Sequence, residues 1–115
     1  MNKKRRNVLH AALDDLARLQ DPIEKEEAIT ILKKIQVNVD KCMNEEEDAL
    51  DAIPDSFRWS TRYDEMSENV SDLCEASGEL DTIIETCQQA GVFQYDSIKE
   101  DTIKTVNTIK RAIER

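Results

Sequence analysis

Apolar residues recur at helical spacing in four segments of the chain. The first segment runs from about residue 8 to residue 19, and its leucines lie three or four positions apart at Leu9, Leu13, Leu16 and Leu19. This spacing places their side chains on one face of a helix, because a helix turns once in about 3.6 residues. The pattern predicts a short helix that ends before the Asp-Pro pair at residues 21 and 22.

The second segment extends over residues 22–53 without an internal glycine or proline. Asp21 is a favoured N-cap and Pro22 a favoured first helical residue, so we expect a helix to begin there. It should end at Pro54, which lacks an amide hydrogen and disfavours helical geometry at the preceding residue. Its apolar stripe comprises Ile29, Leu32, Ile35, Val39, Met43, Leu50 and Ile53.

The third segment, residues 61–90, follows a heptad pattern typical of coiled coils. Ser60 or Thr61 is expected to cap its start, and Gly91 its end. Gly78 in its interior suggests close backbone packing. The stripe comprises Tyr63, Met66, Val70, Leu73, Ser77, Leu80, Ile84 and Cys87.

A fourth, shorter helix is predicted after the link at residues 92–96. Ser97 and Glu100 have the spacing of a capping box, in which each side chain bonds to the backbone of the other residue. The apolar stripe that follows comprises Ile98, Thr102, Val106, Ile109 and Ile113.

The two long helices, 22–53 and 61–90, should fold back on each other as an antiparallel hairpin, since each can bury its stripe on the other. In that register Cys42 lies level with Cys74. The shorter helices attach at the base of the hairpin, giving a single all-α domain over residues 1–115 that resembles a four-helix bundle. They should leave the upper half, about residues 39–74, without cover, so we expect self-association there. The apolar residues concerned are Val39, Met43, Leu50, Ile53, Met66, Val70 and Leu73.

Composition supports the helical prediction and limits the classes of function. The chain has two Gly, two Pro and a net charge of −9, and residues 40–90 carry 15 acidic residues against three basic ones. An acidic middle opposes nucleic-acid binding. Residues 1–7, with basic residues from Lys3 to Arg6, are predicted to be a flexible basic tail. No apolar run suggests a signal peptide or a membrane span, and an odd number of cysteines favours a reducing cytoplasm.

Three of the five aromatic residues lie near the expected hairpin turn. Two interpretations are open. Phe57 and Trp59 plug the end of the hairpin while Tyr63 opens the stripe of the third helix, or these residues form a partner-binding tip. Trp, Tyr and Arg are enriched at interface hot spots. The partner-binding candidates are therefore Phe57, Arg58, Trp59, Arg62 and Tyr63.

The acidic residues suggest a second class of function. Glu24, Glu27, Glu45 and Asp48 have a spacing similar to that of all-α, magnesium-dependent nucleotide pyrophosphohydrolases of the MazG type. On one continuous helix, however, Glu27 and Glu45 would lie about 27 Å apart and could not share an ion. The alternative is an oligomeric metal-dependent hydrolase whose ligands lie near one level of the hairpin. They would be Glu45, Glu46, Asp48, Glu65, Glu68 and Asp72.

No other chemistry is indicated by the sequence. His10 is the only histidine, the glycines are isolated, and the cysteines lack the spacing of a zinc site, so we expect no catalytic residue and no cofactor. Residues 53–73, IPDSFRWSTRYDEMSENVSDL, resemble a segment of small helical proteins of bacterial phages and mobile elements. The resemblance implies a short cytoplasmic accessory protein. We therefore expect a non-enzymatic interaction or assembly module whose partner is a second copy or another helical protein.

Overall fold

Four α-helices and three short 3₁₀ turns make up the chain in the computed structural model, which describes all 115 residues. The helices are α1 (Lys3–Ala17), α2 (Lys25–Asp51), α3 (Thr61–Gln89) and α4 (Lys99–Glu114). The turns are η1 (Arg18–Gln20), η2 (Asp55–Phe57) and η3 (Tyr95–Ser97). The all-α prediction is confirmed.

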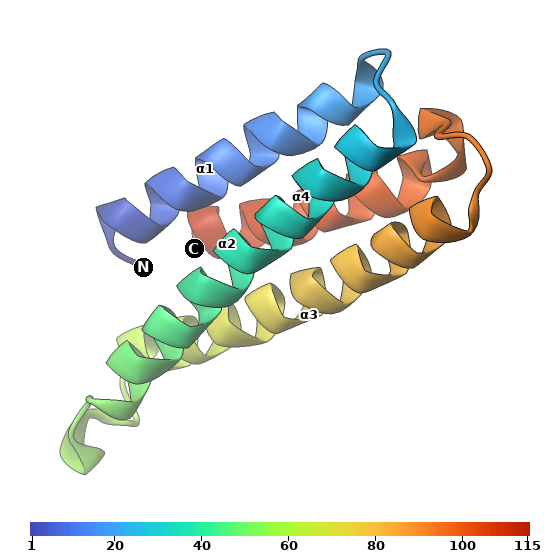
Figure 1. Cartoon of the computed structure of the whole chain (residues 1–115). Helices are drawn as coiled ribbons and strands as arrows, with labels where there is room; N and C mark the ends of the chain where they lie inside the picture. The colour runs from blue at the N-terminus through green and yellow to red at the C-terminus, as the bar shows by residue number, and fades with distance from the viewer.

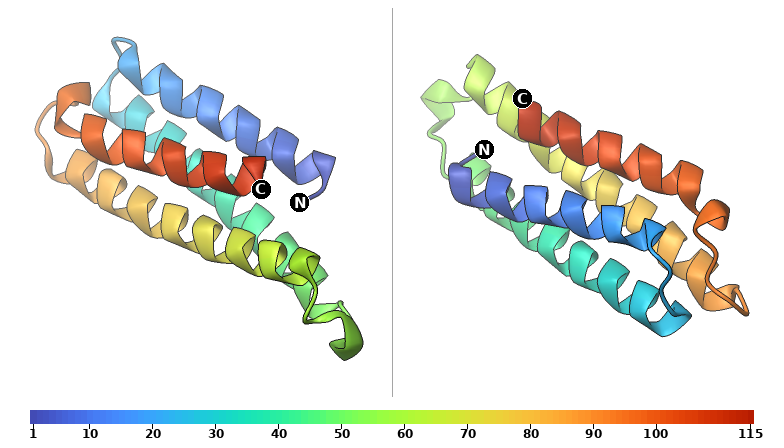
Figure 2. Two further views of the ribbon diagram at one scale, coloured as in Figure 1. Left: turned by 180° about the vertical axis from the view of Figure 1, so that it is seen from behind. Right: turned by 90° about the horizontal axis from the view of Figure 1, so that it is seen from above.

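Consecutive helices run antiparallel and pack side by side, and α1 also packs against α4 (Figure 1). The chain therefore forms an up-down-up-down bundle. Both termini lie on the same side, partway along the α2–α3 hairpin, which continues beyond them (Figure 2). The molecule is elongated, with extents of 54 × 22 × 19 Å.

The bundle is held together by the apolar stripes that define the helices in the sequence. Each stripe faces inward because burying apolar surface is the main favourable contribution to folding. α2 and α3 together supply most of the centre, and Leu9, Leu16 and Leu19 contribute from the first helix and η1. Five core residues of α2 and α3 lie outside the predicted stripes: Ala28, Ile31, Cys42, Ala76 and Ile83. Completely buried residues include Leu32, Ile35, Val39, Leu73, Leu80 and Ile109.

Polar contacts agree with the predicted register of the hairpin to within about one helical turn. Gln36 of α2 donates to the carbonyl of Ser77, at 3.1 Å, and to the carboxylate of Asp81. Nearer the base, the ammonium of Lys25 donates to the carbonyl of Gln88 at 3.1 Å. α2 and α3 therefore pair in the register that was predicted from the position of the turn between them.

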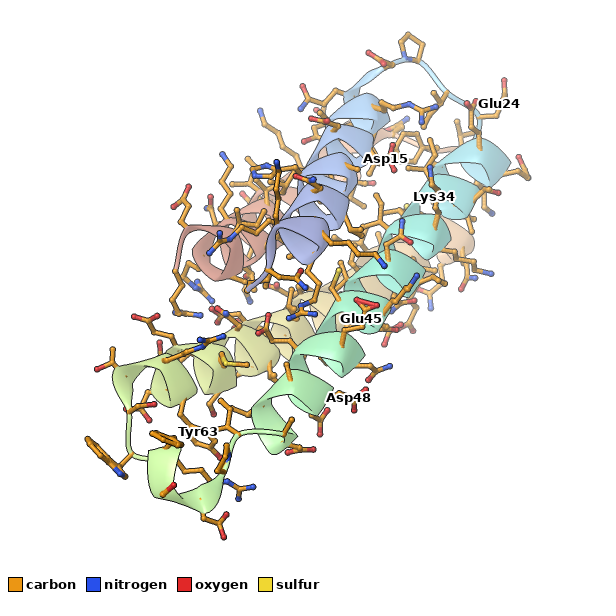
Figure 3. All side chains as sticks on the ribbon, turned by 90° about the vertical axis from the view of Figure 1, so that its left-hand side faces the viewer. Asp15, Glu24, Lys34, Glu45, Asp48 and Tyr63 are labelled. Atoms are coloured by element: carbon orange, nitrogen blue, oxygen red, sulfur yellow. The ribbon has the colours of Figure 1, made fainter.

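The outer helices are joined to the hairpin by ion pairs. Lys34 of α2 lies 3.5 Å from the carboxylate of Asp15 in α1, where Figure 3 labels both residues. Lys104 of α4 lies 3.8 Å from Glu79 in α3. The lysine of each pair is largely exposed, so these pairs contribute little to stability on their own.

The start of the chain is helical, and the prediction of a flexible tail over residues 1–7 is wrong. Asn2 caps α1 by accepting a hydrogen bond from the amide of Arg5 at 2.9 Å, and helix geometry begins at Lys3. The basic residues that suggested a solvated tail occupy the first turn of the helix, where Arg5 and Arg6 are only partly exposed.

Two predicted helix caps are also wrong. Asp21 is extended, as expected before a proline, and its amide closes η1 on the carbonyl of Arg18, so α2 begins at Lys25. Ser97 donates to the carbonyl of Gln94 at 2.7 Å instead of capping α4. By contrast, the predicted Ser60 cap is confirmed, because Ser60 Oγ accepts from the amide of Tyr63 at 3.2 Å.

The glycine predictions are wrong as well. A methyl group added at Gly78 would meet no atom within 4 Å, so no helix packs closely there. The helix α3 ends at Gln89 with Ala90 in extended geometry, and Gly91 has no positive φ angle. Neither position therefore needs a glycine for the reason that the sequence suggested.

The uncovered part of the hairpin is smaller than predicted. Because α1 begins at Lys3 and α4 continues to Glu114, the outer helices cover the hairpin as far as Glu46 and Glu68. Val39 and Leu73 are completely buried in the bundle, although both were expected to be uncovered. Only the segment 47–67, called the hairpin tip below, extends past the outer helices. None of the helices is both long enough and apolar enough to cross a membrane.

Candidate functional site

The hairpin tip is closed by a series of tight backbone turns. α2 ends at Asp51, three residues before Pro54, and the carbonyl of Pro54 accepts from the amide of Phe57 at 2.9 Å. The amide of Ser60 then donates to the carbonyl of Phe57 at 3.2 Å, immediately before the Ser60 cap starts α3. These short-range bonds satisfy part of the backbone within the turn itself, and Ser60 Oγ adds a side-chain bond by donating to the carbonyl of Phe57 at 2.8 Å.

The aromatic residues of the tip face solvent. Trp59 is 82% exposed and Phe57 is 59% exposed, while Tyr63 is half-buried at the start of α3. The interpretation that Phe57 and Trp59 plug the end of the hairpin is therefore wrong. Large exposed aromatic side chains are uncommon on a surface that has no binding role, because they leave apolar area in water.

The structure brings the five predicted partner-binding residues together at one end of the molecule. Phe57, Arg58 and Trp59 follow one another in the turn, and Arg62 and Tyr63 lie in the first turn of α3. The guanidinium of Arg58 lies 3.2 Å from the Asp55 carboxylate and also donates to the carbonyl of Ile53 at 3.3 Å. Phe57 and Arg62 line an open hollow of about 370 Å³, completed by Ile53, Pro54 and Ser60.

The predicted metal-binding carboxylates do not form a cluster. No group of three or more His, Cys, Asp or Glu side chains is placed to hold an ion. Glu24 lies at one end of α2, far from Glu45 and Asp48 near the other end (Figure 3). Around α2, Glu46 points in a different direction from Glu45 and Asp48, because successive helical residues are about 100° apart while residues three apart share a face.

Arginines from the outer helices pair with three of the six carboxylates proposed as metal ligands. Arg5 of α1 lies 3.5 Å from Glu46. Arg115 lies 3.0 Å from Glu68 and 2.8 Å from Asp72, and Arg111 lies 3.2 Å from Asp72. The hydrogen bond from Arg111 to Asp72, together with the charge of that carboxylate, raises the pKa of Arg111.

The sequence pattern does not predict this layer of arginines, because it places Arg5 and Arg6 in a flexible tail and indicates no role for Arg111 and Arg115. One signal was present: Asn2 is a favoured N-cap residue, and it precedes the run of basic residues. An N-cap there would have placed Arg5 on the same face as Leu9, four residues later.

The three thiols should differ in reactivity, because Cys74 is exposed while Cys42 and Cys87 are buried. Burial, with a contribution from nearby Glu45, raises the pKa of Cys42 to about 11, and burial also raises the pKa of Cys87. Only the thiolate is nucleophilic. We therefore expect iodoacetamide to label Cys74 first in the folded protein and all three residues after denaturation, as read by peptide mass spectrometry.

The same shift predicts a loss of stability at alkaline pH. The unfolded chain loses the Cys42 proton near the ordinary pKa of 9.0, whereas the folded chain holds it until about 11. Protonation of Cys42 therefore favours the folded state fully below pH 9, and this contribution decreases as the pH rises from 9 to 11. Cys42→Ala should show a smaller loss over that range, and equal losses would contradict the assignment.

Comparison with family models, with curated proteins and with solved structures gives no match for this chain.

Proposed function

We propose that this chain is a non-enzymatic helical assembly module that associates with a second copy of itself through the hairpin tip. The observation that supports the proposal is the exposure of Trp59 and Phe57 at the end of a hairpin that extends past the rest of the bundle. Burying an aromatic side chain removes about 150–250 Å² from water. Two such residues on each copy supply the apolar centre of a contact.

Charge supports a second copy as the partner. Arg62 is exposed at the tip and makes no ion pair within the chain, while the exposed acids nearby include Asp51, Asp55 and Asp64. In a two-fold symmetric dimer each contact occurs twice. Arg62 of one copy therefore faces an acidic residue of the other copy, and the Arg62 of that second copy faces the same acidic residue of the first. The tip is therefore self-complementary in charge, even though its net charge is negative.

The size of the tip indicates a weak association. A stable interface buries about 800 Å² on each partner, and the aromatic residues supply only part of that area. The flanks of α2 and α3 must contribute the remainder, including the hollow beside Phe57. We expect dissociation constants in the micromolar range.

The exposed thiol of Cys74 fits a reducing cytoplasm, and the resemblance to accessory proteins of phages and mobile elements supports the same location.

The proposal predicts that a Phe57→Ala, Trp59→Ala double variant remains monomeric. Sedimentation velocity over a range of micromolar concentrations should show the wild type moving from a 13.2 kDa monomer toward a dimer. The double variant should stay at the monomer mass. At concentrations where both are monomeric, each replacement should change the free energy of unfolding by no more than about 0.5 kcal/mol, because both side chains are exposed.

Val92→Ala is the matched control, because Val92 is 74% exposed but lies in the turn at the opposite end of the bundle. This variant should dimerise like the wild type. A wild type that stays monomeric at all these concentrations, or a double variant that dimerises normally, would contradict the proposal. Trp59 is the only tryptophan, so a blue shift of its fluorescence with rising concentration gives an independent readout.

A further inference from the structure

A polar cavity of about 340 Å³ lies where the hairpin leaves the bundle. Its walls come from the start of α1, the last residue after α4, and the facing surfaces of α2 and α3. The volume lies within the range of small-molecule sites, which is about 300–1,000 Å³. The charged residues that line it are Arg5, Arg6, Glu46, Arg62, Glu65 and Arg115.

Glu46 is the unusual member of this set. Its side chain is 0% exposed, and neither carboxylate oxygen accepts a hydrogen bond from any group of the chain. Arg5 Nε lies 3.5 Å from one oxygen, which gives a charge pair without hydrogen-bond geometry. A buried carboxylate without donors is costly, since it has lost its hydration without replacement. Glu46 therefore holds two unused acceptors that lie covered at the wall of the cavity, and a ligand reaches them by displacing a neighbouring side chain.

The arginines on the cavity wall divide into engaged and free groups. Arg115 is engaged with Glu68 and Asp72 and donates to Asn69 at 3.1 Å, and Arg5 faces Glu46. Arg6 and Arg62 make no ion pair within the chain. In addition, Arg6 Nε is buried and has no hydrogen-bond partner. Apart from the residues already paired, the wall thus holds two arginines and one acidic residue, Glu65.

This arrangement selects for a ligand with two different ends. A simple anion would face the Glu46 carboxylate, and a simple cation would face the free arginines, so each would meet repulsion. A molecule with paired N–H donors at one end and an anionic group at the other satisfies both sides. Paired donors suit a carboxylate, which accepts two parallel bonds, and guanidinium groups suit phosphate or carboxylate in the same way.

We propose that this cavity binds a small zwitterionic or amino-bearing anionic molecule. Glu46 accepts hydrogen bonds from its N–H donors, and Arg6 and Arg62 hold its phosphate or carboxylate. Two sources share this chemistry: a nucleotide whose base has an amino and an imino donor on one edge, and an amino acid with a guanidinium side chain. Arg62 also belongs to the dimer contact proposed above, whereas Glu46 and Arg6 belong to the cavity alone.

The test is calorimetric titration of the whole chain with three probes. Guanosine monophosphate represents the nucleotide source and L-arginine the amino-acid source, while inorganic phosphate represents an anion without donors. We expect one of the first two to bind and to raise the melting temperature, because a ligand that binds only the folded state stabilises it. Phosphate should bind at least about tenfold more weakly, because it makes no bond to Glu46.

Two variants and a control locate the site. Glu46→Gln keeps the shape but replaces one acceptor oxygen by a donor, and it should weaken binding about tenfold or more. Arg62→Ala tests the anionic end without risk to folding, since Arg62 is exposed and unpaired, and it should weaken binding similarly. Lys4→Ala removes an exposed cation in the first turn of α1 that does not line the cavity, and it should bind like the wild type.

Three results would overturn the inference. The first is that neither guanosine monophosphate nor L-arginine binds at millimolar concentration. The second is that phosphate binds as tightly as either probe, which would make the cavity a simple anion site. The third is that Arg62→Ala leaves the binding of the preferred probe unchanged.

Discussion

Replacing Arg5 by methionine should lower the free energy of unfolding by about 3 kcal/mol. Arg5 is the only charged partner of Glu46, and the two side chains are 13% and 0% exposed. Removing one member of a buried ion pair leaves an uncompensated charge, a change that typically costs about 3–5 kcal/mol. Because the pair already lacks a hydrogen bond, we place the expected loss at the lower end of that range.

The matched control is the double variant Arg5→Met, Glu46→Leu. It replaces both charges by apolar side chains of similar size, and such replacements of whole buried pairs are often neutral or stabilising. Urea denaturation of the two variants and the wild type measures the difference. We expect the double variant to recover most of the lost stability. If the single variant loses less than about 1 kcal/mol, the size of an average point mutation, Glu46 is not buried against Arg5 in solution.

Ile35→Ala should have an effect of similar size at the centre of the bundle. Ile35 is completely buried within the main core, on the face of α2 that packs against its neighbours. Truncating such a side chain loses its burial and leaves a cavity, which together cost about 2–5 kcal/mol. Thermal or urea unfolding measures the loss directly.

Val37→Ala provides the comparison on the same helix, two residues further on. Val37 is 65% exposed, so its replacement should change the free energy of unfolding by no more than about 0.5 kcal/mol. The contrast between the two variants tests which face of α2 is buried. Equal losses would show that α2 is rotated about its axis relative to the arrangement described above.

The positions of the four helices were predictable because they depend on local spacing. An apolar stripe at intervals of three and four residues requires a helix that faces a core, wherever that core is. Pro54 stops α2 for a covalent reason, and Ser60 caps α3 through a bond that spans only three residues. The hairpin register followed as well, since the length of the turn between two long helices sets which residues face each other.

The helix ends at Asp21, Ser97 and Gly91 were not predictable from the same signals. At each of these places a typical capping residue is present, but the neighbouring residues instead form a 3₁₀ turn or an extended link. A capping residue has several local hydrogen bonds available to it, and Ser97 uses one within η3. Which of these hydrogen bonds forms depends on the path of the segment that connects the two helices.

The candidate sites were only partly accessible from the sequence. The five residues of the tip lie together because they are neighbours in the chain, and their role in partner binding stays a prediction. Whether Trp59 and Phe57 are buried or exposed depended on the path of the turn, which is closed by backbone bonds and leaves both side chains outside. The candidate metal ligands were chosen only by their height along the hairpin. That height does not show which side chains of the surrounding helices α1 and α4 lie next to them.

The sequence by itself determined that this protein is all-α, with a long hairpin and two shorter helices, because helix formation and amphipathic burial are encoded by residues a few positions apart. Only the tertiary structure decided how far α1 and α4 reach along the hairpin. That reach brings Arg5 to Glu46 and Arg115 to Asp72, and it leaves the cavity and the exposed tip above them. Partners about 40 residues apart in the chain meet because separate helices stop at the same level, which no local pattern specifies.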